Sequence, residues 1–173
     1  MPALTPDEIA DFLLTRGVLM RIATVDREGD PHVTPIWFLF DDGRIWFTPR
    51  EQSAWFQHIR AHPRIAVTID EEAAPYRKVT VKGATEIVHD LGDDDAWRDR
   101  YRRIAERYTT PEGAEAYITN TIDQPRALIS LRLDACEVTT WRMPRRGEAP
   151  TGIWHRRYYT EGSKYAREAD RPS

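Results

Sequence analysis

The chain contains 173 residues, a length that suits one domain with a sizeable hydrophobic core. Its net charge is −3 and no apolar run approaches the ~18 residues that span a bilayer, so neither nucleic acid nor a membrane is expected as a partner. The single cysteine, Cys136, excludes an intramolecular disulfide and a multi-cysteine metal site, and it fits a reducing, cytoplasmic location.

The first predicted element is a helix that begins after Thr5. Thr5 can cap the helix, Pro6 suits its first position, and Glu8 completes a capping box. Gly17 ends the apolar periodicity that follows. We expect this helix to cover one end of the fold.

Three β-branched and aromatic runs come next, separated by clusters of Asp and Gly. This pattern is typical of a strand meander, and Gly29 and Gly43 supply turn positions at which a positive φ costs nothing. The apolar residues between Ser53 and Pro63 then recur at helical spacing. The predicted strands are residues 18–25, 31–40 and 44–48, and the predicted helix is residues 54–62.

The second half of the chain combines further strands with a helical block. A long strand contains Gly83, which indicates a bulge or bend within it. Between residues 90 and 124, aromatic and apolar residues recur every three or four positions, which predicts a pair of helices between strands. The last two strands are joined tightly near Asp134. The predicted strands are residues 64–70, 76–88, 127–133 and 135–142.

The segment after residue 142 differs in composition from the rest. Pro and Gly interrupt it repeatedly, and it is rich in basic and aromatic residues. We therefore divide the chain into a β-rich domain, residues 1–142, and a C-terminal arm, residues 143–173. The aromatic and basic cluster at 153–159 would pack on the domain or on a neighbouring subunit, fold over a cofactor or substrate, or contact nucleic acid.

The run from residue 18 to residue 88 resembles the flavin-binding split β-barrels related to pyridoxamine 5′-phosphate oxidase. The matching segments are Ala23-Thr24-Val25, Gly29-x-Pro31-His32-Val33-Thr34-Pro35-Ile36-Trp37, Ile45-Trp46-Phe47-Thr48, Ile59-Arg60-x-x-Pro63-Arg64-Ile65-Ala66-Val67 and residues 77–88. The resemblance implies a mainly β fold with helices (α+β): an FMN-binding split β-barrel of six to seven antiparallel strands. It also implies an N-terminal helix, a short helix after strand three, a helical insertion before the last strands, and a homodimer with the cofactor at the subunit interface.

The same resemblance implies where a cofactor would lie. Backbone groups at the end of the second strand would face the polar edge of a flavin ring, and a phosphate would lie near the start of the helix after strand three. Helix N-terminal amides and a nearby arginine form an anion site, which supports this placement. Without a ligand, the aromatic residues of these strands would simply form barrel core. The residues so assigned are Thr34, Pro35, Ile36 and Trp37 for the ring, and Thr48, Pro49, Arg50 and Ser53 for the phosphate.

Position 55 departs from the family pattern, in which a Lys or Arg occupies this place on the helix. An indole at Trp55 cannot neutralise a phosphate, and losing one cation–phosphate contact removes on the order of 1.5–3 kcal/mol of binding. Trp55 would instead stack on the ring, or the pocket would hold another planar ligand such as haem. Lys82 or an arginine of the arm would supply the missing charge.

The sequence therefore favours an FMN- or deazaflavin-dependent oxidoreductase that transfers hydride to or from a small organic substrate. No catalytic side chain is assigned, which agrees with chemistry supplied by the coenzyme. Two alternatives stay open: a non-catalytic barrel that carries flavin or haem, and a barrel that acts only through protein contacts. His58 and His62 have the spacing of metal ligands on a helix, but without a third ligand we expect a solvated helix face and no metal site.

Overall fold

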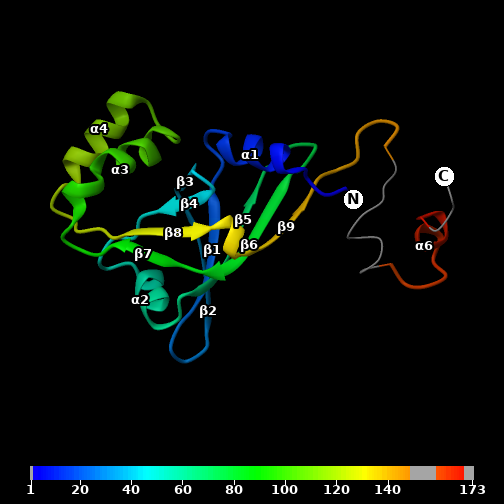
Figure 1. The fold of residues 1–173 in the computed structure, drawn as a ribbon, viewed down its shortest axis with the longest axis horizontal. Helices are drawn as coiled ribbons and strands as arrows, with labels where there is room; N and C mark the ends of the chain where they lie inside the picture. Colours follow the sequence, from blue (N-terminus) through cyan, green and yellow to red (C-terminus); the bar gives the residue numbers. More distant parts are fainter. Residues whose placement is uncertain (1, 149–158, 170–173) are drawn as a thin grey trace.

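Two antiparallel sheets make up most of the computed structural model, which describes residues 2–148 and 159–169 (Figure 1). The first sheet has the strand order β2-β1-β5-β6-β9, and the second has the order β3-β4-β8-β7. The strands are β1 Met20–Val25, β2 Pro31–Ile36, β3 Leu39–Asp41, β4 Arg44–Phe47, β5 Arg64–Asp70, β6 Lys78–Ala84, β7 Glu86–His89, β8 Leu128–Arg132 and β9 Glu137–Trp141. The helices are α1 Pro6–Leu14, α2 Ala54–Ala61, α3 Arg98–Glu106, α4 Pro111–Asn120 and α6 Lys164–Ala169, with 3-10 turns η1 Asp94–Trp97 and η2 Leu133–Ala135.

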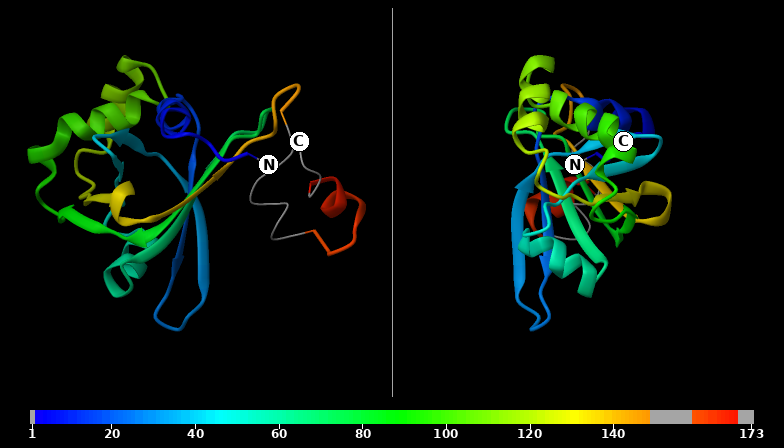
Figure 2. Two further views of the ribbon diagram at one scale, coloured as in Figure 1. Left: turned by 45° about the vertical axis from the view of Figure 1, so that its right-hand side comes forward. Right: turned by 90° about the vertical axis from the view of Figure 1, so that its left-hand side faces the viewer.

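The predicted fold class is confirmed, but the described residues form nine strands rather than six or seven. The run 31–40 divides into β2 and β3, and the run 76–88 divides into β6 and β7, because each crosses from one sheet to the other (Figure 2). A β-rich composition continues through such a crossing, so periodicity alone does not reveal it. The last two predicted strands, β8 and β9, also lie in different sheets and are joined by η2.

The central strands β4 and β8 of the second sheet are buried on both faces along most of their length, which explains their nearly continuous apolar sequence. Ile45 and Phe47 point into the main core between the sheets. Trp46 lies between them in sequence and packs on the opposite side, against Trp97 and Tyr101 of the helical insertion. The alternation of side chains along β4 therefore serves two cores at once.

Close packing explains the glycine at position 83, and the bulge or bend that we predicted there is not present. Strand β6 stays paired with β5 through Gly83, and the chain turns away only at Thr85. A Cβ atom on Gly83 would lie 2.2 Å from the Sγ atom of Cys136. Glycine is therefore required at this position because the segment leading into β9 approaches the backbone closely.

Replacing Gly83 by alanine should lower the free energy of unfolding by about 1–3 kcal/mol, because the new Cβ must displace Cys136. Urea denaturation measures this loss. The substitution should cost less in a Cys136→Ala background, where the nearest remaining contact is the Cβ of residue 136 at 3.1 Å. A loss below about 0.5 kcal/mol in the Gly83→Ala protein would contradict this account of the site.

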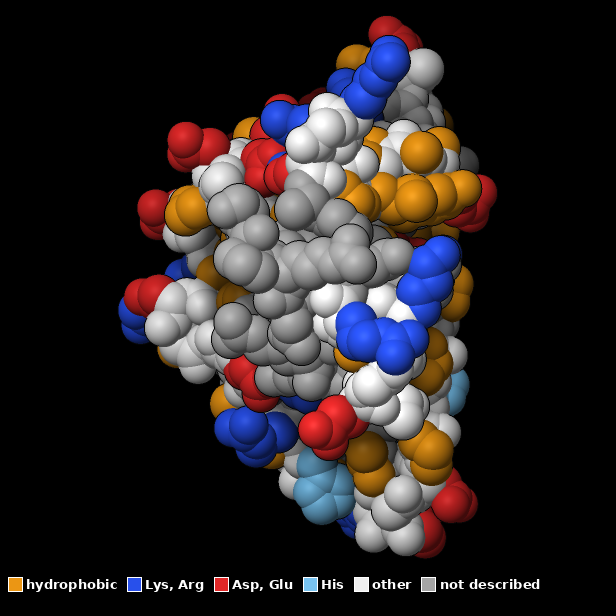
Figure 3. Space-filling model, turned by 90° about the vertical axis from the view of Figure 1, so that its right-hand side faces the viewer, with side chains coloured by type: hydrophobic (Ala, Val, Ile, Leu, Met, Phe, Trp, Pro, Cys, Tyr) orange, Lys and Arg blue, Asp and Glu red, His pale blue; other side chains and the backbone are white. Residues whose placement is uncertain are grey.

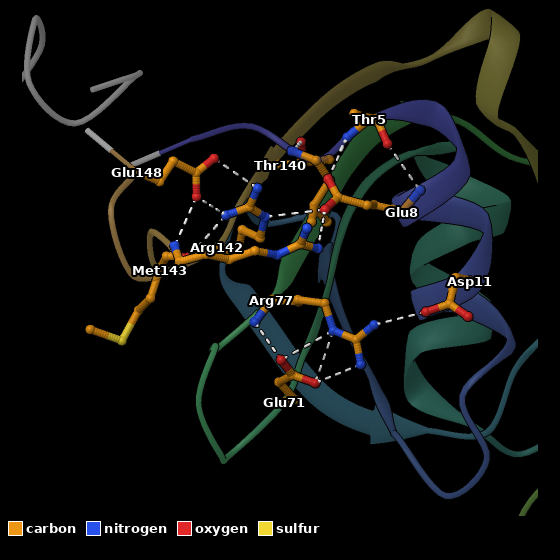
Figure 4. Close-up of polar contacts among 11 residues, drawn as sticks. Thr5, Glu8, Asp11, Glu71, Arg77, Thr140, Arg142, Met143 and Glu148 are labelled. Carbon is orange, nitrogen blue, oxygen red and sulfur yellow. Dashed lines mark hydrogen bonds and ion pairs between the residues drawn. The ribbon is translucent and has the colours of Figure 1, made fainter. Parts of the chain in front are cut away.

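The start of α1 is tied to the last strand through one carboxylate (Figure 4). The predicted capping box is present, with Thr5 and Glu8 each accepting a backbone hydrogen bond from the other. Glu8 also accepts from Arg142 and Arg145, at 3.3 and 2.8 Å. The backbone hydrogen bond at Thr5, followed by the charges of these arginines, holds the pKa of Glu8 below its usual value against the opposing effect of burial. Arg142 also pairs with Glu148, so this cluster joins α1, β9 and the segment after it.

The described part of the arm comprises residues 143–148 and 159–169, and most of the cluster at 153–159 lies outside the described residues. The domain boundary after residue 142 therefore stays a prediction.

Acidic and basic side chains are interspersed on the side of the molecule shown in Figure 3. No helix within residues 2–148 and 159–169 combines the length and apolar character needed to cross a membrane.

Candidate cofactor site

The predicted helical insertion is present and packs on the outer face of the second sheet. Its first part, η1 and α3, buries Trp97, Tyr101 and Ile104. Helix α4 begins at the cap Thr110, whose hydroxyl accepts from the backbone of Gly113 at 3.1 Å. The stripe of aromatic residues predicted from the sequence thus faces Trp46 and its neighbours in the sheet.

Tyr108, just after α3, attaches this insertion to the barrel. Its hydroxyl donates to the carbonyl of Val18 at 2.9 Å and accepts from the backbone N–H of Phe38 at 3.1 Å. Its ring stacks on Trp37, with 5.1 Å between centroids and 3° between planes. Burial raises the pKa of Tyr108, so the hydroxyl keeps its proton as a donor. These contacts hold Trp37 at the point where the chain leaves β2.

A pocket of about 260 Å³ opens beside Trp37. One wall comes from the end of β2, a second from the segment between β4 and α2, and a third from the helical insertion. Six residues predicted to bind a cofactor line it, and four further residues complete the wall. The six are Pro35, Ile36, Trp37, Thr48, Arg50 and Ser53, and the four are Tyr101, Ile104, Tyr117 and Arg126.

The other residues assigned to the cofactor do not line this pocket. Thr34 pairs with Ile22 in the first sheet, and Pro49 is buried with its carbonyl accepting from Ala127. Trp55 packs in the main core, 8 % exposed, with its ring 6.1 Å from that of Phe47. Lys82 is exposed on β6, opposite Glu137 of β9. The indole at position 55 therefore neither fills the pocket nor faces it, and the roles assigned to these four residues stay predictions.

Of the four lining residues that the sequence did not predict, Arg126 is the charged one. It lies directly before β8 and forms an isolated bridge with Arg50. Its side chain is 5 % exposed and its guanidinium carbon lies 4.6 Å from the ring centre of Tyr101. Its backbone N–H donates to the carboxylate of Asp94 at 3.1 Å. The sequence offers one indication that Arg126 is buried, which is its position next to the apolar run of β8.

Two guanidinium groups converge on one phenol oxygen in this pocket. Arg50 and Arg126 each donate through Nη2 to the hydroxyl of Tyr117, at 3.2 and 3.1 Å. Among the described residues, no carboxylate forms an ion pair with either arginine. The like charges of the two guanidinium groups repel each other, and the exposure of Arg50 to solvent weakens this repulsion.

The two tyrosines of the pocket are shifted in opposite directions. Burial raises the pKa of Tyr101 to about 12. Burial acts in the same sense on Tyr117, but the charge of Arg126 and the hydrogen bonds with Tyr101, Arg50 and Arg126 outweigh it, so the pKa of Tyr117 is lowered. The pocket is thus an environment that favours negative charge at the position of the Tyr117 oxygen.

An alkaline titration should resolve these two tyrosines. Tyrosinate absorbance should show an early ionisation that Tyr117→Phe removes and a late one that Tyr101→Phe removes. Since the unfolded chain releases the Tyr101 proton near pH 10 and the folded chain near pH 12, this residue should lower the free energy of unfolding over that interval. Tyr117, whose folded pKa is lowered, should act in the opposite sense. An early phase that survives in Tyr117→Phe would contradict the assignment.

The histidines of α2 serve a local role. The Nδ1 atom of His58 lies 3.0 Å from the hydroxyl of Thr24 on β1, and its ring meets that of His32 edge to face. His62 is exposed at the end of α2. Within the described ranges, no group of three or more His, Cys, Asp or Glu side chains is placed to hold a metal ion.

Comparison with known proteins gives one family for most of the chain. Residues 5–141 match the pyridoxamine 5′-phosphate oxidase family. This range includes both sheets and the helical insertion. No curated protein shows significant sequence similarity to the chain.

Several solved structures share this fold. The conserved hypothetical protein Rv2991 from Mycobacterium tuberculosis is 23 % identical, with a TM-score of 0.64 over 87 % of this chain and 92 % of that chain. An F420 reductase is 28 % identical, with a TM-score of 0.53 over 72 % of this chain and 93 % of the other. HutZ, the haem storage protein from Vibrio cholerae, is 19 % identical, with a TM-score of 0.59 over 78 % and 94 %. Proteins with this architecture therefore differ in function, so the function of this chain has to be argued from the residues of its pocket.

Proposed function

This chain belongs to the pyridoxamine 5′-phosphate oxidase family, and from that premise we propose that it is an oxidoreductase using FMN or a deazaflavin coenzyme. The coenzyme would exchange a hydride with a small organic substrate, which is the chemistry that such a ring supplies when bound. The observation that carries the proposal is the pocket lining, which combines two arginines, a threonine and a serine with an aromatic wall and contains no acidic residue.

The residues present fit an anionic, planar coenzyme. Arg50 and Ser53, at the start of α2, would hold its phosphate. The backbone from Pro35 to Trp37 would border the ring, and Tyr101 would exclude water from the inner wall. The proposal leaves the catalytic side chains unassigned, since the chain's contribution to hydride transfer is to bind, orient and keep the site dry.

The pocket in one chain is small for a flavin, and this supports a homodimer in our proposal. Its volume of about 260 Å³ falls below the roughly 300–1,000 Å³ typical of sites that enclose a drug-sized ligand. A second copy would supply the missing wall, with Lys82 and Trp141 near the other chain's pocket. Light scattering at micromolar concentration should give the mass of a dimer, and a monomer would contradict this part of the proposal.

The single cysteine supports a cytoplasmic location.

The test of the proposed function is a titration of the purified protein with FMN and with a deazaflavin coenzyme. Binding of either, followed by its reduction and transfer of the hydride to an acceptor, is the expected result. NADPH-driven and deazaflavin-driven reduction assays would separate the two coenzymes. A protein that binds neither would refute the assignment.

A non-catalytic carrier is the second candidate, and a specific observation favours it. Trp55 stands where the family usually carries a cation, and the solved structures of similar fold include a haem storage protein. A carrier would bind the coenzyme or haem without turnover. A Soret band on addition of haem, together with absent flavin binding, would favour this candidate over the oxidoreductase.

A further inference from the structure

We propose that Arg126 and Arg50, joined by the hydroxyl of Tyr117, form a clamp for one phosphate-type anion. The clamp draws its main cation from the segment between α4 and β8, and it takes the place of the cation that the family carries at position 55. This inference rests on the proposed function only for the identity of the molecule that carries the anion.

The first support is that Arg126 lacks a negatively charged or carbonyl acceptor. Within the part of the chain that the structure describes, three arginines are buried: Arg107, Arg126 and Arg142. Arg107 donates to two carbonyls at the end of α1, and Arg142 pairs with two carboxylates. Among the described residues, Arg126 donates from its guanidinium only to the phenol of Tyr117, and its buried Nε, like that of Arg107, has no partner. A buried cation so weakly compensated is costly unless an anion joins it.

The second support is the position of Arg50. Its Nη2 and that of Arg126 hydrogen-bond the same oxygen, so the two forks lie within reach of a single group. Arg50 is exposed at the mouth of the pocket, whereas Arg126 lies at its inner wall. A planar guanidinium group donates two parallel hydrogen bonds to two oxygens of a phosphate. The phenol of Tyr117 has one oxygen, so it cannot accept both.

The third support is the free start of α2. Ser53 is its N-cap residue, but the hydroxyl accepts from the backbone N–H of Arg50 at 3.2 Å and makes no capping hydrogen bond. The N–H of Phe56 donates to the carbonyl of Ser53 at 2.9 Å, so the amides of Ala54 and Trp55 are the ones left for a further acceptor. Helix amides and two arginines together make a site for a phosphate rather than for a neutral group.

The anion has two chemical sources that share this recognition: the phosphate monoester of FMN and the phosphodiester of a deazaflavin coenzyme. Each has a phosphate-free counterpart, riboflavin and the corresponding deazariboflavin. Comparing each coenzyme with its counterpart measures the clamp, because the ring contacts cancel. Comparing the two coenzymes identifies the source.

The experiment measures dissociation constants of all four compounds for the full chain and three variants. In the unmodified protein, one coenzyme should bind roughly 10- to 100-fold more tightly than its phosphate-free counterpart. Arg126→Met should reduce this ratio to about one. Arg100→Met is the matched control, because Arg100 lies in the same insertion, stacks on Trp46 and does not line this pocket.

Arg50→Gln guards against a folding defect in the Arg126 variant. Arg50 is exposed, so its replacement should leave the fold intact while it lowers the same ratio. Phosphorus NMR of inorganic phosphate supplies a readout without any ring: the unmodified protein should broaden the signal, and Arg126→Met should not.

The outcomes separate the clamp from the proposed function. Equal affinity for a coenzyme and its phosphate-free counterpart in the unmodified protein would overturn the clamp and leave the coenzyme assignment standing. Phosphate binding that depends on Arg126, with no affinity for any of the four rings, would support the clamp and refute the proposed function. A ratio that survives in Arg126→Met and Arg50→Gln would overturn the clamp.

Discussion

Replacing Arg50 by alanine should weaken coenzyme binding roughly 10- to 100-fold, whereas His62→Ala should leave it within about twofold. A hydrogen bond to a charged group contributes about 1.5–3 kcal/mol, and each 1.4 kcal/mol corresponds to a tenfold change in the dissociation constant. Arg50 lines the pocket at the start of α2 and donates to Tyr117, while His62 lies at the opposite end of that helix. Quenching of flavin fluorescence on titration measures both constants.

The two variants form a matched pair because both residues are exposed and both flank α2. Their circular dichroism spectra and unfolding midpoints should agree with those of the unmodified protein, so a difference in binding reports the pocket. Equal losses in Arg50→Ala and His62→Ala would count against the phosphate site at the start of α2.

Replacing Tyr108 by phenylalanine should lower the free energy of unfolding by about 2–4 kcal/mol. The hydroxyl joins two backbone groups, the carbonyl of Val18 and the N–H of Phe38, and its removal leaves both without that partner. A buried donor or acceptor left unsatisfied costs about 1–3 kcal/mol. The ring is retained, so the stack on Trp37 survives and the loss reports the hydrogen bonds alone. Urea denaturation gives the value.

Tyr76→Phe is the control for this prediction, because Tyr76 is 44 % exposed and its hydroxyl can bind water. Its replacement should change the free energy of unfolding by less than about 0.5 kcal/mol. Tyr108→Phe should also weaken coenzyme binding, since Tyr108 attaches the helical insertion to the barrel at the edge of the pocket. A Tyr108→Phe protein as stable as the control would show that water replaces the hydroxyl without cost.

Both predictions concern residues that the sequence marks only in part. The family resemblance predicts a phosphate contact for Arg50, and its place just before a predicted helix supports that prediction. Tyr108 was assigned to a helical stripe, and its hydrogen bonds to Val18 and Phe38 connect positions 90 and 70 residues away. A helical period records burial of the ring and contains no information about the partner of its hydroxyl.

Features that depend on neighbouring residues can be predicted from the amino-acid sequence alone. The start of α1 follows from Thr5, Pro6 and Glu8, whose groups satisfy one another within one turn. Strand and helix types follow from side-chain period, and the family resemblance rests on the matching segments between residues 23 and 88. They could be predicted because the interactions that produce them close over a few positions of the chain.

The points at which long β-rich runs change sheets, and the side chains that line the pocket together, become known only from the folded structure. Arg126 meets Arg50 and Tyr117 because β8 pairs with β4, which brings distant segments to one sheet edge. Trp55 faces the core because packing against Phe47 selects that side of α2. These outcomes depend on the register of the sheets and on which apolar faces are buried. Both depend on contacts between residues far apart in the chain, so a local sequence pattern does not predict them.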